Sequence, residues 1–190
     1  MITSVRNPRV AGAVKLKKRA FRERDRAFLV EGLQAVTEAV DSGPGLSTLF
    51  VSTLDRFAWR CVAVCMLSTH WHAIIDLPDD SLPAGMHRLV GGYSRRFNER
   101  HERAGYLVRD RYWSRRKETA DAVLQAFRYV ARNPLGAGLV QRPEDWPWSS
   151  YGKTIGVSSS FDFVDATDVL AEFGSTRIAQ IGGLRRFVES

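Results

Sequence analysis

Two histidines separated by a single residue are the first candidates for chemistry in this chain. His70 and His72 lie between two apolar runs, residues 62–67 and 73–75. Because side chains alternate along a strand, His70 and His72 are predicted to point to one side and Trp71 to the opposite, core-facing side. Two imidazoles on one rigid edge can begin a divalent-metal site. The plainer interpretation is that both lie at the exposed end of a hairpin, and so short a motif leaves it open.

A second candidate set lies in residues 118–132, where the spacing of apolar residues predicts a helix. Its buried stripe is predicted to comprise Val123, Phe127 and Val130. Gln125, Tyr129 and Asn133 recur every four residues and should line another face of that helix. Pro134 predicts that the helix stops just after Asn133. A tyrosine and an amide one turn apart can also be structural, with the hydroxyl hydrogen-bonded at the margin of the core.

The two sets together predict phosphodiester chemistry. Two neutral imidazoles and the amide oxygen of Asn133 would give three ligands for Mg²⁺ or Mn²⁺, with open positions for phosphate oxygens. Tyr129 would then be a nucleophile beside a polarised phosphodiester. A covalent phosphotyrosine would conserve the bond energy for rejoining.

The charge of the chain favours a polyanionic partner, and nucleic acid fits best. The net charge is +7 and the sequence pI is about 9.8. Residues 82–97 have the apolar spacing of an amphipathic helix, and aromatic residues are interleaved with basic ones up to residue 117. A solvated basic surface without a partner is the alternative. The predicted DNA-binding residues are Arg88, Arg95, Arg96, Arg100, Arg109, Arg111, Arg115, Arg116 and Lys117.

The length of 190 residues fits one ordinary domain, or one domain and a fragment. Residues 46–51 could form a short strand, and residues 53–60 the last turns of a helix. Residues 142–151 should be a rigid aromatic loop that caps the core. The apolar runs are too short for a membrane helix, and we expect a cytoplasmic protein without a membrane partner. Cys61 and Cys65 are expected to pack in the core in a reducing compartment.

The first 52 residues resemble a known segment. Residues 2–10, 28–32 and 49–52 are similar to the start of the substrate-binding domain of SpoU-type RNA 2′-O-methyltransferases. The catalytic domain of those enzymes is absent, so the resemblance does not imply methyl transfer here. It adds the idea that residues 1–50 form a basic arm that binds RNA.

The next hundred residues resemble the REP-associated tyrosine transposases, which belong to the single-tyrosine HUH transposase superfamily. The matching stretches, in the family's order and spacing, are residues 65–72, 93–98, 129–140 and 143–151. The resemblance implies an α+β fold, with a ferredoxin-like antiparallel sheet and helices on one face. It also implies His70, His72 and Asn133 at the metal and Tyr129 as nucleophile. The implied activity is metal-dependent cleavage and strand transfer of single-stranded DNA at hairpin or palindromic repeats, through a 5′-phosphotyrosine, by a monomer or homodimer.

Two departures from that family bear on function. Thr69 stands where family members usually have asparagine, which is a mild change. More seriously, the arm of residues 1–52 replaces the family's first strand and helix, although that strand normally lies centrally in the sheet. We therefore divide the chain into the arm at 1–52, a transposase-like domain at 53–156 and a helical appendage at 157–190. The alternative to an active enzyme is a catalytically impaired fusion remnant that only binds single-stranded nucleic acid.

Overall fold

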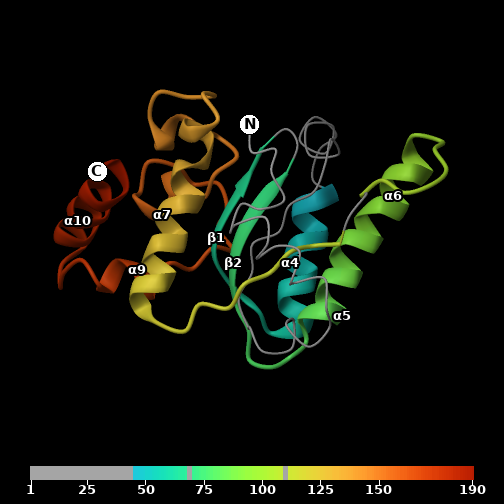
Figure 1. Ribbon diagram of the computed structural model, residues 1–190, viewed down its shortest axis with the longest axis horizontal. Coiled ribbons are helices and arrows are strands. Elements are labelled where there is room, and N and C mark those ends of the chain that lie inside the picture. Colours follow the sequence, from blue (N-terminus) through green and yellow to red (C-terminus); the bar gives the residue numbers. More distant parts are fainter. Residues whose placement is uncertain (1–44, 68–69, 109–110) are drawn as a thin grey trace, which may run out of the picture.

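A two-stranded antiparallel sheet lies at the centre of the computed structural model, which describes residues 45–67, 70–108 and 111–190 (Figure 1). Strand β1 (Arg60–Met66) pairs with strand β2 (Trp71–Asp76), and the register sets Cys65 opposite His72. Residues 1–44 of the predicted RNA-binding arm, together with Thr69 and Arg109, fall outside the described residues.

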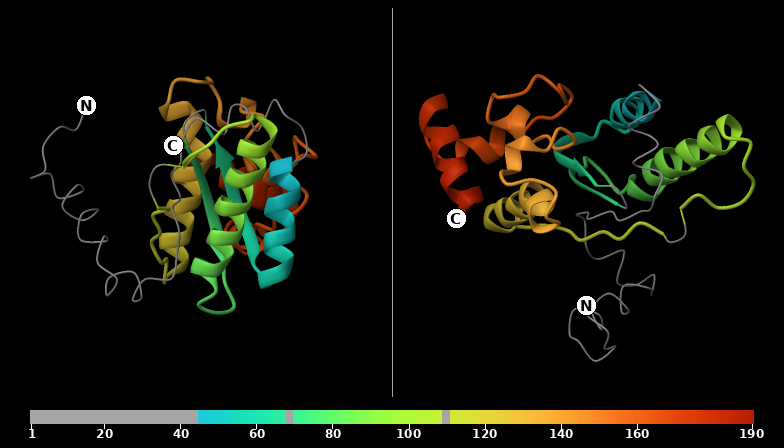
Figure 2. Two further views of the ribbon diagram at one scale, coloured as in Figure 1. Left: turned by 90° about the vertical axis from the view of Figure 1, so that its right-hand side faces the viewer. Right: turned by 90° about the horizontal axis from the view of Figure 1, so that it is seen from above.

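Helices cover both faces of this sheet (Figure 2). One face, here called the α7 face, packs against α7 (Ala120–Gly136), α8 (Tyr151–Thr154), α9 (Thr167–Ala171) and α10 (Arg177–Glu189). The other, the α4 face, packs against α4 (Gly45–Phe57), α5 (Leu82–Met86) and the π-helical turn η1 (His87–Gly91), which continues into α6 (Gly92–Arg100). A 3₁₀ turn, η2 (Pro143–Asp145), precedes α8. The α+β class and the antiparallel pairing are therefore confirmed, whereas the predicted placement of all helices on one face is wrong.

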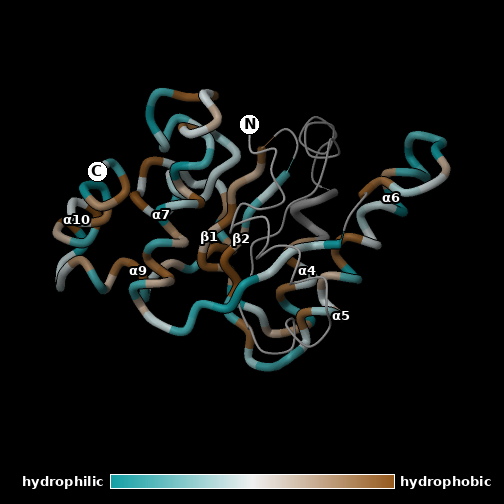
Figure 3. Tube along the Cα trace, viewed as in Figure 1, coloured by the Kyte–Doolittle hydropathy of each residue, from teal (hydrophilic) through white to brown (hydrophobic). Residues whose placement is uncertain are grey.

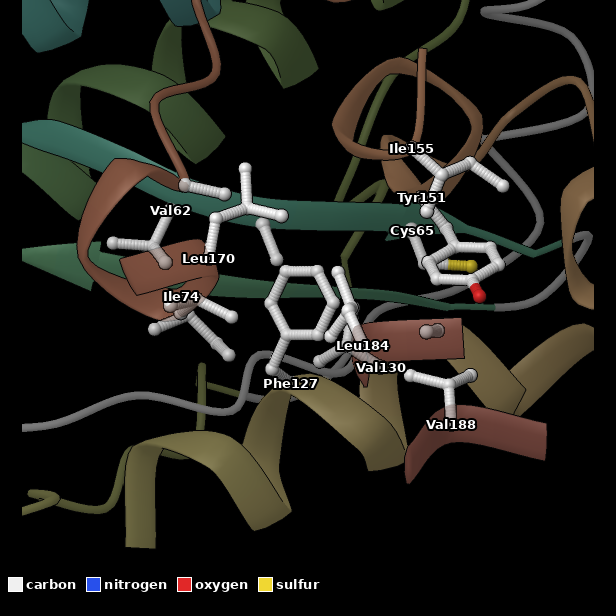
Figure 4. Packing of buried hydrophobic residues seen from close by; sticks show 14 of the residues in the cluster. Val62, Cys65, Ile74, Phe127, Val130, Tyr151, Ile155, Leu170, Leu184 and Val188 are labelled. Carbon is white, nitrogen blue, oxygen red and sulfur yellow. The ribbon is translucent and has the colours of Figure 1, made fainter. Parts of the chain in front are cut away.

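The strand sequences explain why both faces are covered. On the α7 face, Val62 and Ile74 contact the cluster around Phe127, as Figure 4 shows. On the α4 face, Val64 and Ala73 are fully buried. Each strand is therefore apolar on both sides, which gives the continuous brown stretches of β1 and β2 in Figure 3. A strand with one solvated face would instead alternate apolar and polar residues.

The aromatic loop of residues 142–151 covers the outer edge of β1. The Met66 amide donates to the Trp148 carbonyl at 2.9 Å, and the Ser150 amide donates to the Val64 carbonyl at 2.9 Å. The indole of Trp146 donates to the Met66 carbonyl at 2.7 Å. The loop therefore protects an edge that would otherwise be open to pairing with another strand. Within the described ranges, no strand pairs with the outer edge of β2.

Two local predictions need correction. Residues 46–51 are not a strand, since they lie in α4, where Phe50 and Leu54 are buried one turn apart. The apolar residues of this segment recur at helical spacing, and the short run 49–51 only imitates a strand. Helix α7 also does not stop at Asn133 but continues through Pro134 to Gly136.

Pro134 lies in the last turn of α7, where its missing N–H removes one helix hydrogen bond, the one to the Val130 carbonyl. The Ala137 amide donates to the Asn133 carbonyl, and the Leu139 amide donates to the Pro134 carbonyl, both at 3.0 Å. Gly138 adopts a φ of 71°, which lets the chain turn away from the helix as in a common helix ending. At the other end, the Thr119 side chain caps the helix by accepting from the Ala122 amide.

The C-terminal segment 157–190 is part of the core and does not form an appendage. Leu184 and Val188 of α10 are completely buried, and Val169 of α9 is 2% exposed. Arg132 of α7 donates from its guanidinium to the Val188 carbonyl at 2.7 Å. Helix α10 therefore stabilises the helix that carries Tyr129.

Both cysteines are free and buried, as the sequence predicts. Burial raises the pKa of Cys61 and of Cys65 to about 12, so neither thiol ionises near neutral pH. Among the residues described, no helix has both the length and the apolar character that crossing a bilayer requires.

Candidate active site

The two histidines lie at the start of β2 and face α7. Their ring centroids are 4.7 Å apart and the ring planes are nearly perpendicular. The backbone fixes their position, because the Leu67 amide donates to the His70 carbonyl at 2.8 Å. Trp71 points to the opposite side and makes an edge contact with Phe50 of α4 at 6.1 Å. The alternation predicted for these three side chains is confirmed.

His72 is a buried polar side chain without hydrogen-bond partners. It is 0% exposed, and neither ring nitrogen has a partner in the part of the chain that the structure describes. Burial lowers its pKa to about 4, and repulsion from His70 acts in the same direction. Asn133 lies close enough to oppose this shift in part, although the two side chains do not meet hydrogen-bond geometry. At neutral pH the imidazole is uncharged, which is the form that binds metal ions.

Tyr129 meets His72 from the facing helix. The centroid of its ring lies 5.3 Å from that of His72 in an edge contact, while half of the tyrosine remains exposed. Asn133 follows one turn later on the same helix. The structure therefore brings together all four residues that the sequence singled out: His70, His72, Tyr129 and Asn133.

The donor set fits a divalent metal ion. Neither buried nitrogen of His72 has a partner among the described residues, and a buried polar group without a partner costs about 1–3 kcal/mol. A bound ion would satisfy one of these two nitrogens. An amide oxygen and imidazole nitrogens are suitable ligands for Mn²⁺, and less so for Mg²⁺, which prefers oxygen. In the described ranges, no group of three His, Cys, Asp or Glu side chains is placed to hold a metal. The candidate site thus depends on an amide as its third ligand.

A hollow of about 790 Å³ lies beside Tyr129 along α7. Its walls include Gln125, Tyr129 and Asn133, so the predicted shared face of the helix is confirmed. They also include two residues that the sequence analysis did not select, Arg128 and Arg132. The sequence could have identified Arg128 and Arg132, because they are four residues apart on one helix and lie on either side of Tyr129 in the chain.

The predicted DNA-binding residues divide into exposed and half-buried groups. The exposed ones are Arg88, Arg95, Arg96, Arg100, Arg111 and Arg115. Arg116 and Lys117 are half-buried, and burial lowers the pKa of Lys117, with a further contribution from the charge of Arg115. Arg95, Arg96 and Arg100 lie on α6, which projects away from the sheet in Figure 1. The guanidinium of Arg103, near the end of that helix, lies 5.7 Å from the ring centroid of Phe97.

The comparisons with known proteins agree with this geometry. The chain is 23% identical to a protein of Haemophilus influenzae that is named as a REP-associated tyrosine transposase. The match covers 56% of this chain and 66% of the relative, just under two thirds of its length. A solved structure of a REP-associated tyrosine transposase bound to a REP hairpin superimposes with a TM-score of 0.59 at 16% identity, over 74% of this chain and 87% of that one. The resemblance to this family is confirmed, and the two chains share a fold.

A different family matches the N-terminal part. The model for the MRM3-like substrate binding domain matches residues 7–69. This match extends beyond residue 52 and covers α4 and β1. The region similar to RNA-methyltransferase substrate-binding domains therefore includes one of the two strands that carry the candidate site.

Proposed function

We propose that this protein binds single-stranded DNA at hairpin or palindromic repeats and cleaves it in a transposase-like reaction with Tyr129 as the nucleophile. The observation that carries the proposal is the contact of Tyr129 with His72, a buried imidazole whose two nitrogens have no partner in the described structure. A structural histidine would normally be hydrogen-bonded where it is fully buried. The fold shared with a hairpin-bound transposase supports the same function.

The residues around Tyr129 suit an attack on a phosphodiester. Half of the tyrosine is exposed, so its hydroxyl can reach a strand on the surface. In the proposed step, a bond forms between the tyrosine oxygen and phosphorus while the bond from phosphorus to the 3′ oxygen breaks. The tyrosine proton leaves to solvent, the 3′ oxygen takes up a proton, and the 5′ phosphate remains on Tyr129. Attack by a 3′ hydroxyl in the reverse sense would rejoin a strand.

His70, His72 and Asn133 would hold Mg²⁺ or Mn²⁺ in this proposal. When bound, such an ion polarises the phosphate and stabilises the charge that develops on its oxygens. His72 is pre-organised for this role because its burial keeps the imidazole neutral. On the opposite face of β2, the contact of Trp71 with Phe50 holds the strand against α4.

The exposed arginines of α6 and of residues 111–115 would hold the DNA strand. They supply positive charge along an element that projects from the body of the protein (Figure 1).

A covalent-trapping assay tests the proposal. The protein is incubated with Mn²⁺ and a panel of labelled single-stranded hairpins, and adducts that survive denaturation are resolved by electrophoresis. We expect an adduct that Tyr129→Phe abolishes and that Tyr106→Phe, a change at another exposed tyrosine, leaves intact. An adduct that persists in Tyr129→Phe would overturn the assignment of the nucleophile.

The second candidate is a protein that binds single-stranded nucleic acid without cleaving it. The observation in its favour is the two-stranded sheet, since no strand borders the outer edge of β2 among the described residues. A missing strand would loosen the positions of His70 and His72, and small displacements of catalytic groups are costly. DNA binding without an adduct on any hairpin would favour this candidate.

A further inference from the structure

We propose that Arg128 and Arg132 form a phosphate-binding subsite beside Tyr129, positioned by helix α10, which holds a phosphodiester of the bound DNA strand adjacent to the one under attack. This inference deepens the proposed function and rests on it for the identity of the strand. It assigns a role to two residues outside the basic stretch of residues 88–117. It also gives the C-terminal helix a part in the site.

Arg132 is held in place by the end of α10. Its guanidinium donates to the Val188 carbonyl at 2.7 Å, and this carbonyl belongs to the last turn of the helix. The contact uses one nitrogen of the guanidinium, and the side chain lines the hollow beside Tyr129. A guanidinium has five N–H donors, so others remain available to a phosphate.

Arg128 is held by Phe187, the residue directly before Val188 in α10. The guanidinium carbon of Arg128 lies 5.6 Å from the ring centroid of Phe187. Its Nε is buried and has no hydrogen-bond partner in the described structure, although the side chain lines the same hollow. A buried, charged donor without a partner is costly, and a phosphate oxygen would satisfy it.

The helix places these arginines on the side of Tyr129 away from the metal ligands. At 3.6 residues per turn, Asn133 lies about 40° to one side of Tyr129, while Arg132 and Arg128 lie about 60° and 100° to the other. His72 approaches from the Asn133 side, and it does not line the hollow. A strand with its scissile phosphate at Tyr129 and His72 would therefore extend its next phosphate towards the arginine pair.

The chemistry of the hollow favours a phosphodiester over other ligands. Among the described residues, no acidic side chain lines it, and the walls besides the two arginines are Gln125, Tyr129, Asn133 and the end of α7. Two guanidiniums held about one turn apart match the planar, multidentate recognition of phosphate oxygens. Tyr129, which lines the hollow, is half exposed, so a strand on the surface can reach this group of side chains.

The experiment measures the affinity of the full-length protein for a hairpin with single-stranded tails at several salt concentrations, in EDTA so that cleavage does not interfere. Arg128→Gln and Arg132→Gln are each expected to reduce the slope of log affinity against log salt by about 0.7. When the salt is lowered from 1 M to 0.1 M, the affinity of each variant should therefore rise about fivefold less than that of the unsubstituted protein. The control is Arg186→Gln, which removes the same charge from an exposed position on α10. Its slope should match that of the unsubstituted protein.

The outcomes separate this inference from the proposed function. Equal slopes for all variants, together with a covalent adduct in the trapping assay, would overturn the subsite alone. Reduced slopes without an adduct would support the subsite and count against cleavage. Absence of DNA binding by the unsubstituted protein, or arginine dependence for an RNA strand only, would overturn the subsite. If Arg132→Gln unfolds because the contact with Val188 is lost, Arg128→Gln still decides, since the Nε of Arg128 makes no hydrogen bond to the described residues.

Discussion

The two faces of the sheet differ in how completely their polar groups are satisfied. On the α4 face, the buried indole of Trp59 donates to the Ser81 hydroxyl at 2.8 Å. On the α7 side, His72, Arg128, Glu144 and Tyr151 each have a buried polar atom without a partner in the described structure. Trp113 is a further such residue, and its neighbour Tyr112 packs against the α4-face cluster. Since most buried polar groups in folded proteins are paired, the concentration of unpaired groups on the α7 side marks it as the side where ligands, ions or water would bind. One strand, β2, therefore stabilises the protein through one face and supplies the candidate site from the other.

The strongest test of this comparison is His72→Leu. An apolar residue removes two unpaired nitrogens, so thermal stability in EDTA should stay the same or rise by about 1 kcal/mol. The covalent adduct should disappear, and the stabilisation that Mn²⁺ gives by binding the native state should disappear with it. The measurements are adduct yield and melting temperature with and without Mn²⁺. His87→Leu, at an exposed histidine, is the control. A large loss of stability in EDTA would mean that His72 is a structural residue.

The sequence predicts the site better than it predicts the fold around it. The positions of His70, His72, Tyr129 and Asn133 follow from two local periodicities, alternation along a strand and four-residue spacing on a helix. The anchoring of Arg128 and Arg132 depends on residues more than fifty positions away in α10, so no local pattern could reveal it. The placement of helices on one face was implied by the resemblance to the transposase family, and no local pattern could correct it, since periodicity identifies an apolar side but not its partner.

The role of α10 on the α7 face can be tested with Leu184→Ala. Leu184 is 0% exposed in the cluster around Phe127, so its truncation should cost about 3 kcal/mol of unfolding free energy. Ile178→Ala, on the same helix but 88% exposed, should cost less than about 0.5 kcal/mol. Chemical denaturation measures both. Similar small effects would mean that α10 is an appendage and would remove the basis for its role in positioning the arginines.

The α4 face should respond to overpacking without any effect on chemistry. A Cβ at Gly85 would lie 2.0 Å from the Trp59 ring, so Gly85→Ala should cost about 2 kcal/mol of unfolding free energy. Gly91→Ala is the control because a Cβ there meets nothing within 4 Å, and it should not destabilise the protein. The adduct formed per folded molecule should be unchanged in both variants. A selective loss of adduct in folded Gly85→Ala would show that the two faces are coupled through the strands.

The cysteines give a pH-dependent test of burial on both faces. Their pKa values are raised to about 12 from 9, chiefly by burial. A raised folded-state pKa means that the thiols stabilise the fold fully below about pH 9, and that this contribution is lost between about pH 9 and 12. The loss is roughly one kcal/mol per thiol per pH unit. Chemical denaturation at pH 8.5 and 10.5 measures this loss in the unsubstituted protein and in the Cys61→Ala and Cys65→Ala variants. A loss between the two pH values that neither substitution reduces would contradict the prediction.

The same two thiols also show whether the faces unfold together. Cys61 packs in the α4-face cluster and Cys65 in the α7-face cluster, so each reports on one face. At pH 8 both should resist iodoacetamide in the native state and become alkylated in parallel through a urea transition, because each face buries side chains of the same two strands. Mass spectrometry of the two cysteine-containing peptides measures this. If Cys65 reacts first, the α7 side opens independently, as expected of a face whose polar groups lack partners until a ligand binds. If Cys61 reacts first, the α4 face is the less stable of the two, and the comparison between the faces is reversed.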